Sequence, residues 1–216
     1  MIKFDSVEYQ YPNGGFSTKP LDFEISYGEC IALTGENGCG KTTVGKLAVG
    51  ILRPSRGRVF IKGTDIAALT LGQIGTMVGY LFQDPSRQLF APTVLEDLTF
   101  PNLIAGTDKS AAESSARSAL SKMGILHLEN RSVYRLSGGE KQRLAIAGMI
   151  MKQNLVSLIL DEPTTGLDPK NREILGDIIT VLADEGVSIL LITHDMEFAE
   201  NYCRRKIIMN KGAIIL

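Results

Sequence analysis

Tryptophan is absent from this chain of 216 residues, and cysteine and histidine are scarce. The three cysteines, Cys30, Cys39 and Cys203, are widely spaced and odd in number, which fits neither a disulfide framework nor a zinc site. Together with an amino terminus that lacks the pattern of a secretory signal, they predict a cytoplasmic protein. The longest apolar runs, at 155–160 and 187–192, are far shorter than the roughly 18 residues of a membrane-spanning helix. We therefore do not expect the chain to cross a membrane by itself.

A strong charge of either sign is also lacking. The formal net charge is −1, with 22% charged and 44% hydrophobic residues. No stripe of basic residues marks a surface for nucleic acid, so we expect no nucleic acid among the partners. The length and composition predict one globular domain, or one domain with an inserted subdomain.

Strand and helix patterns alternate along most of the chain. Buried strands separated by helices are typical of a mainly parallel sheet covered on both faces, so the expected fold class is α/β. Between residues 84 and 151 the strand patterns thin out, which predicts a helical insertion. Strand patterns occupy 2–9, 21–26, 30–35, 57–63, 77–83, 157–161 and 187–194, and helical spacing occupies 42–52, 110–124, 138–151 and 169–186.

A glycine-rich run, GENGCGKTT at 35–43, follows an apolar strand pattern and opens a helical one. In that context the pattern G-x-x-x-x-G-K-[ST] predicts a phosphate-binding loop rather than a plain turn that caps a helix. The loop amides would bind phosphate oxygens, Lys41 would add a positive charge at the β- and γ-phosphates, and Thr42 would offer its hydroxyl to Mg²⁺. The run does not say which class of protein carries it.

Two adjacent carboxylates, Asp161 and Glu162, follow the apolar residues of the strand pattern at 157–161. Because neighbouring residues point different ways from a strand end, Asp161 can reach the Mg²⁺ shell while Glu162 faces the γ-phosphate. There Glu162 would orient or deprotonate a water molecule. Acidic residues also commonly lie where a buried strand meets solvent, so this interpretation depends on the phosphate-binding loop.

A second helix is preceded by Ser137, Gly138 and Gly139, in the stretch YRLSGGEKQRLAIAG. A capping box formed with Glu140 would explain the serine and the glutamate. It leaves the glycines unexplained, because two glycines in a first turn weaken a helix unless the backbone approaches something closely. The stretch therefore predicts a second anion-binding helix terminus.

Six motifs in order give the chain a family resemblance. GENGCGKTT, Gln83, LSGGE, LILDEP, TGLD (165–168) and Thr193-His194-Asp195 follow the order and approximate spacing of ATP-binding cassette (ABC) ATPases. The resemblance implies a P-loop NTPase (RecA-like) core with an amino-terminal antiparallel β subdomain and a helical subdomain. It places all of these in a single domain, 1–216, with the core and β subdomain at about 1–83 and 152–216 and the helical subdomain at about 84–151.

In that family two cassettes dimerise head to tail, and each ATP lies between the phosphate-binding loop of one subunit and the LSGGE segment of the other. The resemblance therefore implies ATP and Mg²⁺ as ligands. It also implies a second ABC ATPase subunit as partner, either a copy of this chain or a paralogue. The second helix terminus would then serve the nucleotide of the partner.

The roles of individual residues follow by position. Lys41, Gln83, Glu162 and His194 would be catalytic, with His194 holding the γ-phosphate from a strand next to that of Glu162. The metal would be held by Thr42, Gln83 and Asp161, and Asp168 would couple the two sites. Tyr11 would offer an aromatic face to adenine. The expected nucleotide contacts are Tyr11, Gly35, Asn37, Gly38, Cys39, Gly40, Lys41, Thr42, Thr43, Ser137, Gly138, Gly139 and Asp168.

The segment FQDPSRQLFAPTVLEDLTF, residues 82–100, is similar to that of energy-coupling factor importers and related cobalt and nickel importers, which take up vitamins or transition metals. There the region receives an integral membrane transport subunit, so docking is expected near Gln83–Phe100, with Arg87, Gln88, Leu89 and Phe90 as contacts. The ATPase would then lie peripherally at the cytoplasmic face of the membrane. Alternatively, the segment is a solvated loop before a helix capped by Thr93, with Leu89 and Phe90 in the core.

Other functions remain open. A soluble ABC ATPase, such as an iron–sulfur cluster assembly subunit, has a similar size, whereas a degenerate regulatory module would lack catalytic positions that are present here. Relatives usually continue beyond the strand matching KGAIIL, which predicts a weak or nucleotide-dependent dimer. Cys39 stands where the family often has serine and is interpreted as a tolerated small side chain. Its place at a helix amino terminus predicts alkylation that bound ATP prevents.

Overall fold

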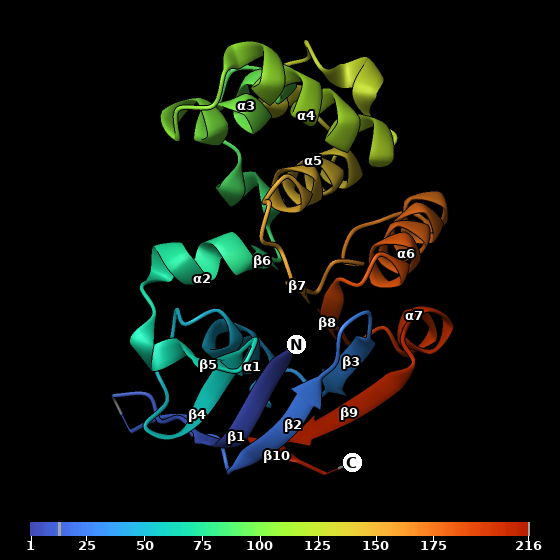
Figure 1. The fold of residues 1–216 in the computed structure, drawn as a ribbon. Helices are drawn as coiled ribbons and strands as arrows, with labels where there is room; N and C mark the ends of the chain where they lie inside the picture. The colour runs from blue at the N-terminus through green and yellow to red at the C-terminus, as the bar shows by residue number, and fades with distance from the viewer. Residues whose placement is uncertain (13, 216) are drawn as a thin grey trace.

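A six-stranded sheet forms the centre of the computed structural model, which describes residues 1–12 and 14–215 (Figure 1). Its strand order is β10-β9-β3-β8-β7-β6. Every pairing is parallel except that of β9 with β10. This confirms the predicted mainly parallel sheet. The strands are β3 (Cys30–Gly35), β6 (Val78–Leu81), β7 (Ser157–Asp161), β8 (Ser188–Ile192), β9 (Arg205–Asn210) and β10 (Ala213–Ile214).

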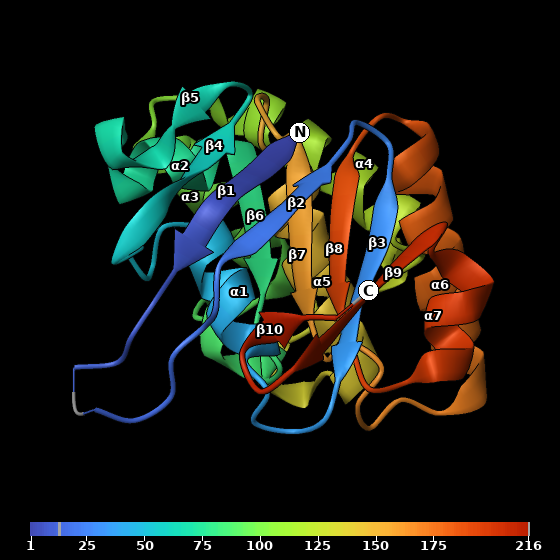
Figure 2. The same cartoon turned by 90° about the horizontal axis from the view of Figure 1, so that it is seen from below.

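A second, antiparallel sheet has the order β2-β1-β4-β5. In Figure 2 its strands β1 and β2 cross in front of the central sheet. The helix α1 (Lys41–Ala48) shares one hydrophobic cluster with both sheets, as does Ile74 of α2 (Leu71–Met77). The strands of this sheet are β1 (Ile2–Glu8), β2 (Leu21–Ile25), β4 (Arg56–Ile61) and β5 (Thr64–Asp65).

The two faces of the central sheet bury separate hydrophobic clusters. Along β7, Leu158 and Leu160 belong to the cluster that includes helices α5, α6 and α7, whereas Ile159 belongs to the cluster with α1. Successive side chains of a strand point to opposite faces, so a continuous apolar run covers both. The sheet is thus packed between two hydrophobic clusters, and these support the strands from which the loops at its carboxyl edge begin.

Helices dominate between β6 and β7. They are α3 (Val94–Ile104), α4 (Lys109–Lys122) and α5 (Gly138–Ile150), and Figure 1 shows them together at the end of the molecule away from the antiparallel sheet. After β7 come α6 (Pro169–Asp184) and α7 (Met196–Tyr202). Short 3₁₀ turns lie at Ile66–Ala68, Pro85–Gln88, Leu126–Leu128 and Val133–Arg135.

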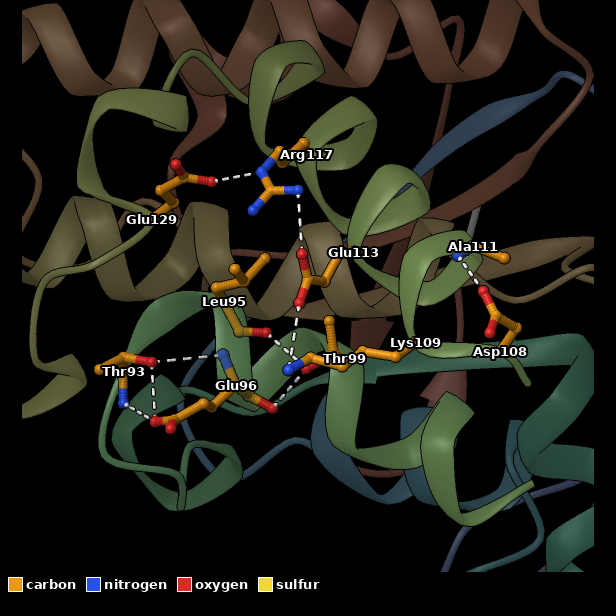
Figure 3. Close-up of polar contacts among 10 residues, drawn as sticks. All are labelled: Thr93, Leu95, Glu96, Thr99, Asp108, Lys109, Ala111, Glu113, Arg117 and Glu129. Atoms are coloured by element: carbon orange, nitrogen blue, oxygen red, sulfur yellow. Dashed lines mark hydrogen bonds and ion pairs between the residues drawn. The ribbon is translucent and has the colours of Figure 1, made fainter. Parts of the chain in front are cut away.

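Side-chain caps and ion pairs fix the helices between β6 and β7 (Figure 3). Thr93 and Glu96 form a capping box at the start of α3, as the alternative for this segment predicted for Thr93. On α4, Arg117 pairs with Glu113 at 3.2 Å and with Glu129 at 2.7 Å. The second pair ties α4 to the turn that follows it.

Several predicted elements end earlier in the structure than the sequence pattern suggested, and two of them border the loops at the carboxyl edge of the sheet. The helix expected over 42–52 stops at Ala48, because Gly50 takes a positive φ of 69° and turns the chain. The strand expected over 77–83 is limited to Val78–Leu81. Gln83 therefore lies in the loop after β6. Among the described residues, no helix is long and apolar enough to cross a membrane.

Candidate functional site

A pocket of about 510 Å³ opens where the carboxyl ends of β3, β7 and β8 meet. Ligands of open parallel sheets bind at this edge, because the loops that leave the strand ends converge there. The phosphate-binding loop enters from β3, and Glu162 and His194 follow β7 and β8. The lining residues are Tyr11, Phe16, Asn37, Gly38, Gly40, Lys41, Thr42, Thr43, Gln83, Glu162, Thr165 and His194.

The loop between β3 and α1 is shaped by close backbone packing. Gly40 has a φ of 111°, and a Cβ there would lie 2.4 Å from the ring of Phe16. The ammonium group of Lys41 donates to the carbonyl oxygens of Gly35 at 2.7 Å and Glu36 at 3.1 Å. The lysine is thus held along the loop, with its positive charge at the pocket wall.

Asp161 is buried beside the first turn of α1. Its Oδ1 accepts a hydrogen bond from the Thr42 hydroxyl at 3.2 Å, and its Oδ2 accepts one from the Tyr80 hydroxyl at 2.7 Å. Burial, together with the nearby charge of Asp161 and this hydrogen bond, raises the pKa of Tyr80. Tyr80 therefore remains a protonated donor that fixes the carboxylate.

The arrangement fits a divalent cation of the Mg²⁺ type. Thr42 and Asp161 bring two oxygen ligands side by side, and Gln83 lines the same pocket. Mg²⁺ is usually held by one or two carboxylates together with phosphate oxygens and water. In the described part of the chain, no group of three or more His, Cys, Asp and Glu side chains forms a closed metal cage. An open site of this kind suits a cation that arrives with a nucleotide.

Glu162 and His194 are hydrogen-bonded at the pocket, with 2.7 Å between Oε2 and Nδ1. The strands that carry them are neighbours, as predicted, since β7 pairs with β8. An ionised carboxylate only accepts hydrogen bonds, so Nδ1 carries the proton in this contact. The backbone of Glu162 has a φ of 51°, anchored by a 2.8 Å bond from its N–H to the Ile192 carbonyl. Such a conformation is costly for a non-glycine residue and is typical of functional sites.

Tyr11 lies at the wall of the pocket, and its hydroxyl is 3.3 Å from that of Thr43. Its ring meets Tyr9 edge-on, with 4.9 Å between centroids. The structure thus brings the aromatic candidate to the phosphate-binding loop, and Phe16 lines the same pocket.

The second helix terminus lies at the start of α5. Ser137 and Glu140 form the capping box, and Gly139 is packed so tightly that a Cβ would lie 3.0 Å from the side-chain oxygen of Asn171. Asn171 also accepts from Arg143 at 2.7 Å and donates to Asp168 at 2.7 Å. The expected residues Ser137, Gly138, Gly139 and Asp168 do not line the 510 Å³ pocket.

Two charged side chains at this terminus have pKa values that are lowered by their surroundings. Burial lowers the pKa of Arg143, and the hydrogen bonds from Asn171 lower the pKa of Asp168. The Nε atom of Arg143 is buried without a hydrogen-bond partner among the described residues. Asn171 therefore stands between a desolvated cation and an exposed carboxylate, and joins α5 to the start of α6.

Cys39 and Gly35 take structural roles in the loop. The thiol of Cys39 is buried in the hydrophobic cluster with α1, and its N–H donates to the Glu36 carbonyl at 3.3 Å. The prediction that Cys39 is alkylated is therefore wrong, because its thiol is buried and an alkylating reagent does not reach it. A Cβ on Gly35 would lie 2.2 Å from the Met209 carbonyl oxygen, so this glycine lets the loop pack on β9.

Only part of the segment that was expected to contact a membrane partner is exposed to solvent. Gln88 turns inward and donates to the Tyr80 carbonyl at 2.8 Å, and Leu89 packs against the core. Phe90 is 53% exposed, so the alternative that placed it in the core is wrong. The buried carboxylate of Asp97 accepts from the N–H groups of Phe90 and Ala91 at 2.8 and 2.9 Å and fixes this turn.

Sequence reasoning missed several residues of the site. Thr165 lines the pocket, Tyr80 holds Asp161, and Asn171 bridges two helices. The strand pattern offers one signal for Tyr80, since it lies on the strand that precedes Gln83. No local pattern marks the contact between Asn171 and Arg143, because Arg143 lies on another helix.

Comparisons with known proteins agree with this geometry. A profile of the ABC transporter family matches residues 18–165. The energy-coupling factor transporter ATP-binding protein EcfA of Methanothermobacter thermautotrophicus is 38% identical over 218 residues, covering 100% of this chain and 70% of that protein. The cbiO1 protein of Clostridium perfringens, part of the ABC transporter complex cbiONQ, superposes with a TM-score of 0.92 at 33% identity, over 100% of this chain and 86% of that one.

A bacterial ABC transporter cassette solved as a dimer superposes with a TM-score of 0.87 at 25% identity, over 100% of this chain and 97% of that one. The family profile matches more than half of the chain, and the similarity to EcfA extends over all of it. This chain therefore belongs to the ABC transporter family, as one of its ATP-binding cassettes.

Proposed function

We propose that this chain is the ATP-hydrolysing subunit of a membrane importer of the vitamin or transition-metal type. The observation that carries the proposal is the Glu162–His194 pair, held at the same pocket as Lys41 and Thr42. A regulatory nucleotide-binding module has no need for a carboxylate and an imidazole at this position. The similarity to EcfA and to cbiO1 supports the importer type.

The residues of the pocket divide the work of phosphoryl transfer to water. Lys41 and the loop amides bind phosphate oxygens, while Thr42, Asp161 and Gln83 would hold Mg²⁺, which when bound would neutralise negative charge on the phosphates. Glu162 accepts the proton of the attacking water as general base. His194 is held by Glu162 through Nδ1, which fixes the ring that contacts the γ-phosphate. Tyr11 supplies a face for the adenine ring.

The second half of each site is supplied by another cassette. Ser137, Gly138 and Gly139 lie at a helix amino terminus outside the 510 Å³ pocket, which suits contact with the nucleotide of a partner. Gly139 is buried, and a Cβ there would lie 3.0 Å from the side-chain oxygen of Asn171, so this glycine lets the start of α5 pack closely against α6. Binding of ATP between two subunits closes the dimer, and hydrolysis reopens it. Either a copy of this chain or a paralogue fits this role.

The membrane partner docks on the surface around Phe90 and α3. Phe90 and Phe100 are both about half exposed and meet edge to face, with 5.1 Å between centroids. Leu103 and Ile104, at the end of α3, are also exposed. Aromatic and aliphatic side chains that gather in this way are typical of an interface with another protein. Docking here would hold the ATPase peripherally at the cytoplasmic face of the membrane.

Turnover of ATP by the purified protein tests the catalytic part. Glu162→Gln removes the general base and is expected to lower kcat roughly 10²-fold or more while ATP still binds. Lys41→Ala is the matched control, because it is expected to weaken ATP binding itself. The Glu162→Gln protein with ATP is also expected to elute as a dimer in size exclusion. Turnover equal to that of Lys41→Ala in the unchanged protein would contradict the proposal.

Co-purification from native membranes tests the transport part. The unchanged protein should bring down an integral membrane subunit that stimulates ATP turnover. Phe90→Asp should lose both effects but keep basal turnover, because Phe90 lies outside the ATP pocket. Leu71→Asp, at a position 56% exposed on α2, is the matched control and should keep the partner. Association with soluble proteins only would favour the non-transport alternative.

A further inference from the structure

Two cysteines that lie 173 residues apart in the sequence are in contact at the start of β3. The Sγ atoms of Cys30 and Cys203 are 2.8 Å apart, and both thiols are free. A disulfide bond is about 2.05 Å long, so the sulfurs need to approach by less than about 1 Å. We propose that Cys30 and Cys203 form an oxidisable dithiol, a modification site that a peroxide converts into an intramolecular disulfide.

Strand pairing brings the two residues together. β3 pairs in parallel with β9, with Ile31 opposite Arg205, and the N–H of Arg204 donates to the Cys30 carbonyl at 3.1 Å. Cys203 directly follows α7, and its N–H donates to the Ala199 carbonyl at 3.0 Å. Both backbones are therefore fixed by hydrogen bonds, and the short separation of the sulfurs follows from the sheet itself.

The two thiols differ in accessibility, which sets the order of events. Cys203 is only partly buried, whereas Cys30 lies within the hydrophobic core. The hydrogen bond to Cys203 and burial raise the pKa of the Cys30 thiol, which keeps Cys30 protonated. Cys203 is consequently the sulfur that meets the oxidant first, since reaction requires an accessible thiolate.

The chemistry balances with one peroxide. The Cys203 thiolate attacks a peroxide oxygen, the O–O bond breaks, and hydroxide leaves, so that Cys203 becomes a sulfenic acid. The Cys30 sulfur then attacks the Cys203 sulfur, the S–S bond forms, the S–O bond breaks, and a second hydroxide leaves. The protons of the two thiols convert the two hydroxides into water. Two thiols lose two electrons in total, and the peroxide is reduced to two water molecules.

The bond would tie the carboxyl end of α7 to the start of β3. It would close a loop of most of the chain, and cross-links that close long loops restrict the unfolded chain most. The third cysteine is not involved, because Cys39 lies in the other hydrophobic cluster, on the opposite face of the sheet. This site does not depend on the proposed ATPase activity.

Mass spectrometry of the full-length protein tests the proposal. After reduction, desalting and treatment with hydrogen peroxide, the intact protein should become lighter by two hydrogen atoms. A peptide map without reductant should contain one cross-linked species that joins Cys30 to Cys203, and dithiothreitol should reverse it. The oxidised protein should melt at a higher temperature than the reduced protein. Cross-links to Cys39 or between two chains, or a lower Tm, would overturn the proposal.

Variants separate the two steps. Cys203→Ser should abolish the cross-link, whereas Cys39→Ser should leave it intact and serves as the matched control. In Cys30→Ala the first step remains, so dimedone should trap a sulfenic acid on Cys203. The unchanged protein should label far less with dimedone, because Cys30 resolves the sulfenic acid. Equal labelling of the unchanged protein and Cys30→Ala would show that Cys30 does not reach Cys203.

Discussion

Tyr80→Phe removes one of the two hydroxyl groups that hold Asp161, the proposed Mg²⁺ ligand. In the structure this hydroxyl donates to Oδ2 of Asp161 at 2.7 Å, and Tyr80 is only 8% exposed. A hydrogen bond to a charged group contributes about 1.5–3 kcal/mol, and its loss leaves a buried carboxylate oxygen without that donor. For a chain of this size each kcal/mol shifts Tm by about 2–4 °C, so we expect Tm to fall by about 3–12 °C.

Thermal unfolding by circular dichroism without nucleotide measures this loss. Tyr27→Phe is the matched control, since Tyr27 is 55% exposed and surface changes usually alter stability by less than about 0.5 kcal/mol. A carboxylate that is free to rotate should also need more Mg²⁺ for half-maximal ATP turnover. Equal melting temperatures and equal Mg²⁺ requirements of the two variants would refute the role of Tyr80 in positioning Asp161.

Three further changes test other parts of the fold. Gly176→Ala should lower Tm, because the added Cβ would lie 2.0 Å from the Tyr202 ring and overpacking costs about 1–3 kcal/mol. In a Tyr202→Ala background the ring is absent, so the same change should be neutral or stabilising. Lys152→Met should raise Tm at pH 7, because burial lowers the pKa of Lys152 and so penalises the charged form in the folded state. This gain in stability is complete below the pKa of Lys152 in the folded protein and should disappear as the pH rises to 10.5, the ordinary pKa of lysine. Thermal unfolding of both proteins at pH 7 and at pH 10 measures the difference. Asn171→Ala should lower Tm and weaken ATP-driven dimerisation of the Glu162→Gln protein in size exclusion, because Arg143 loses its 2.7 Å acceptor.

Local patterns predicted the frame of this molecule because their causes are local. The parallel sheet follows from short apolar runs, and the capping box at Thr93 follows from residue types three positions apart. The phosphate-binding loop was recognisable because a strand, a glycine-rich turn and a helix follow one another directly. The structure brings the residues that this pattern marked, apart from Gly35 and Cys39, to one pocket.

Contacts between distant segments were beyond the reach of the sequence. Cys30 and Cys203 looked unrelated because only the pairing of β3 with β9 makes them neighbours. The same holds for Tyr80 and Asp161, which meet because β6 pairs with β7. Cys39 was misjudged for a related reason: its burial is decided by core packing around α1 and not by its place in the motif.

The start of α6 gives the proposed coupling between two ATP sites a physical path. Asn171 binds Arg143 on α5, the helix that would face the nucleotide of a partner. The next residue, Arg172, forms an ion pair with Asp195, which directly follows His194. Consecutive residues of one helix therefore contact both half-sites, so a shift of α6 moves the two together. Coupling between two sites requires a structural element whose position both sites influence. If Asn171→Ala loses nucleotide-driven dimerisation but still binds ATP, α6 is that element.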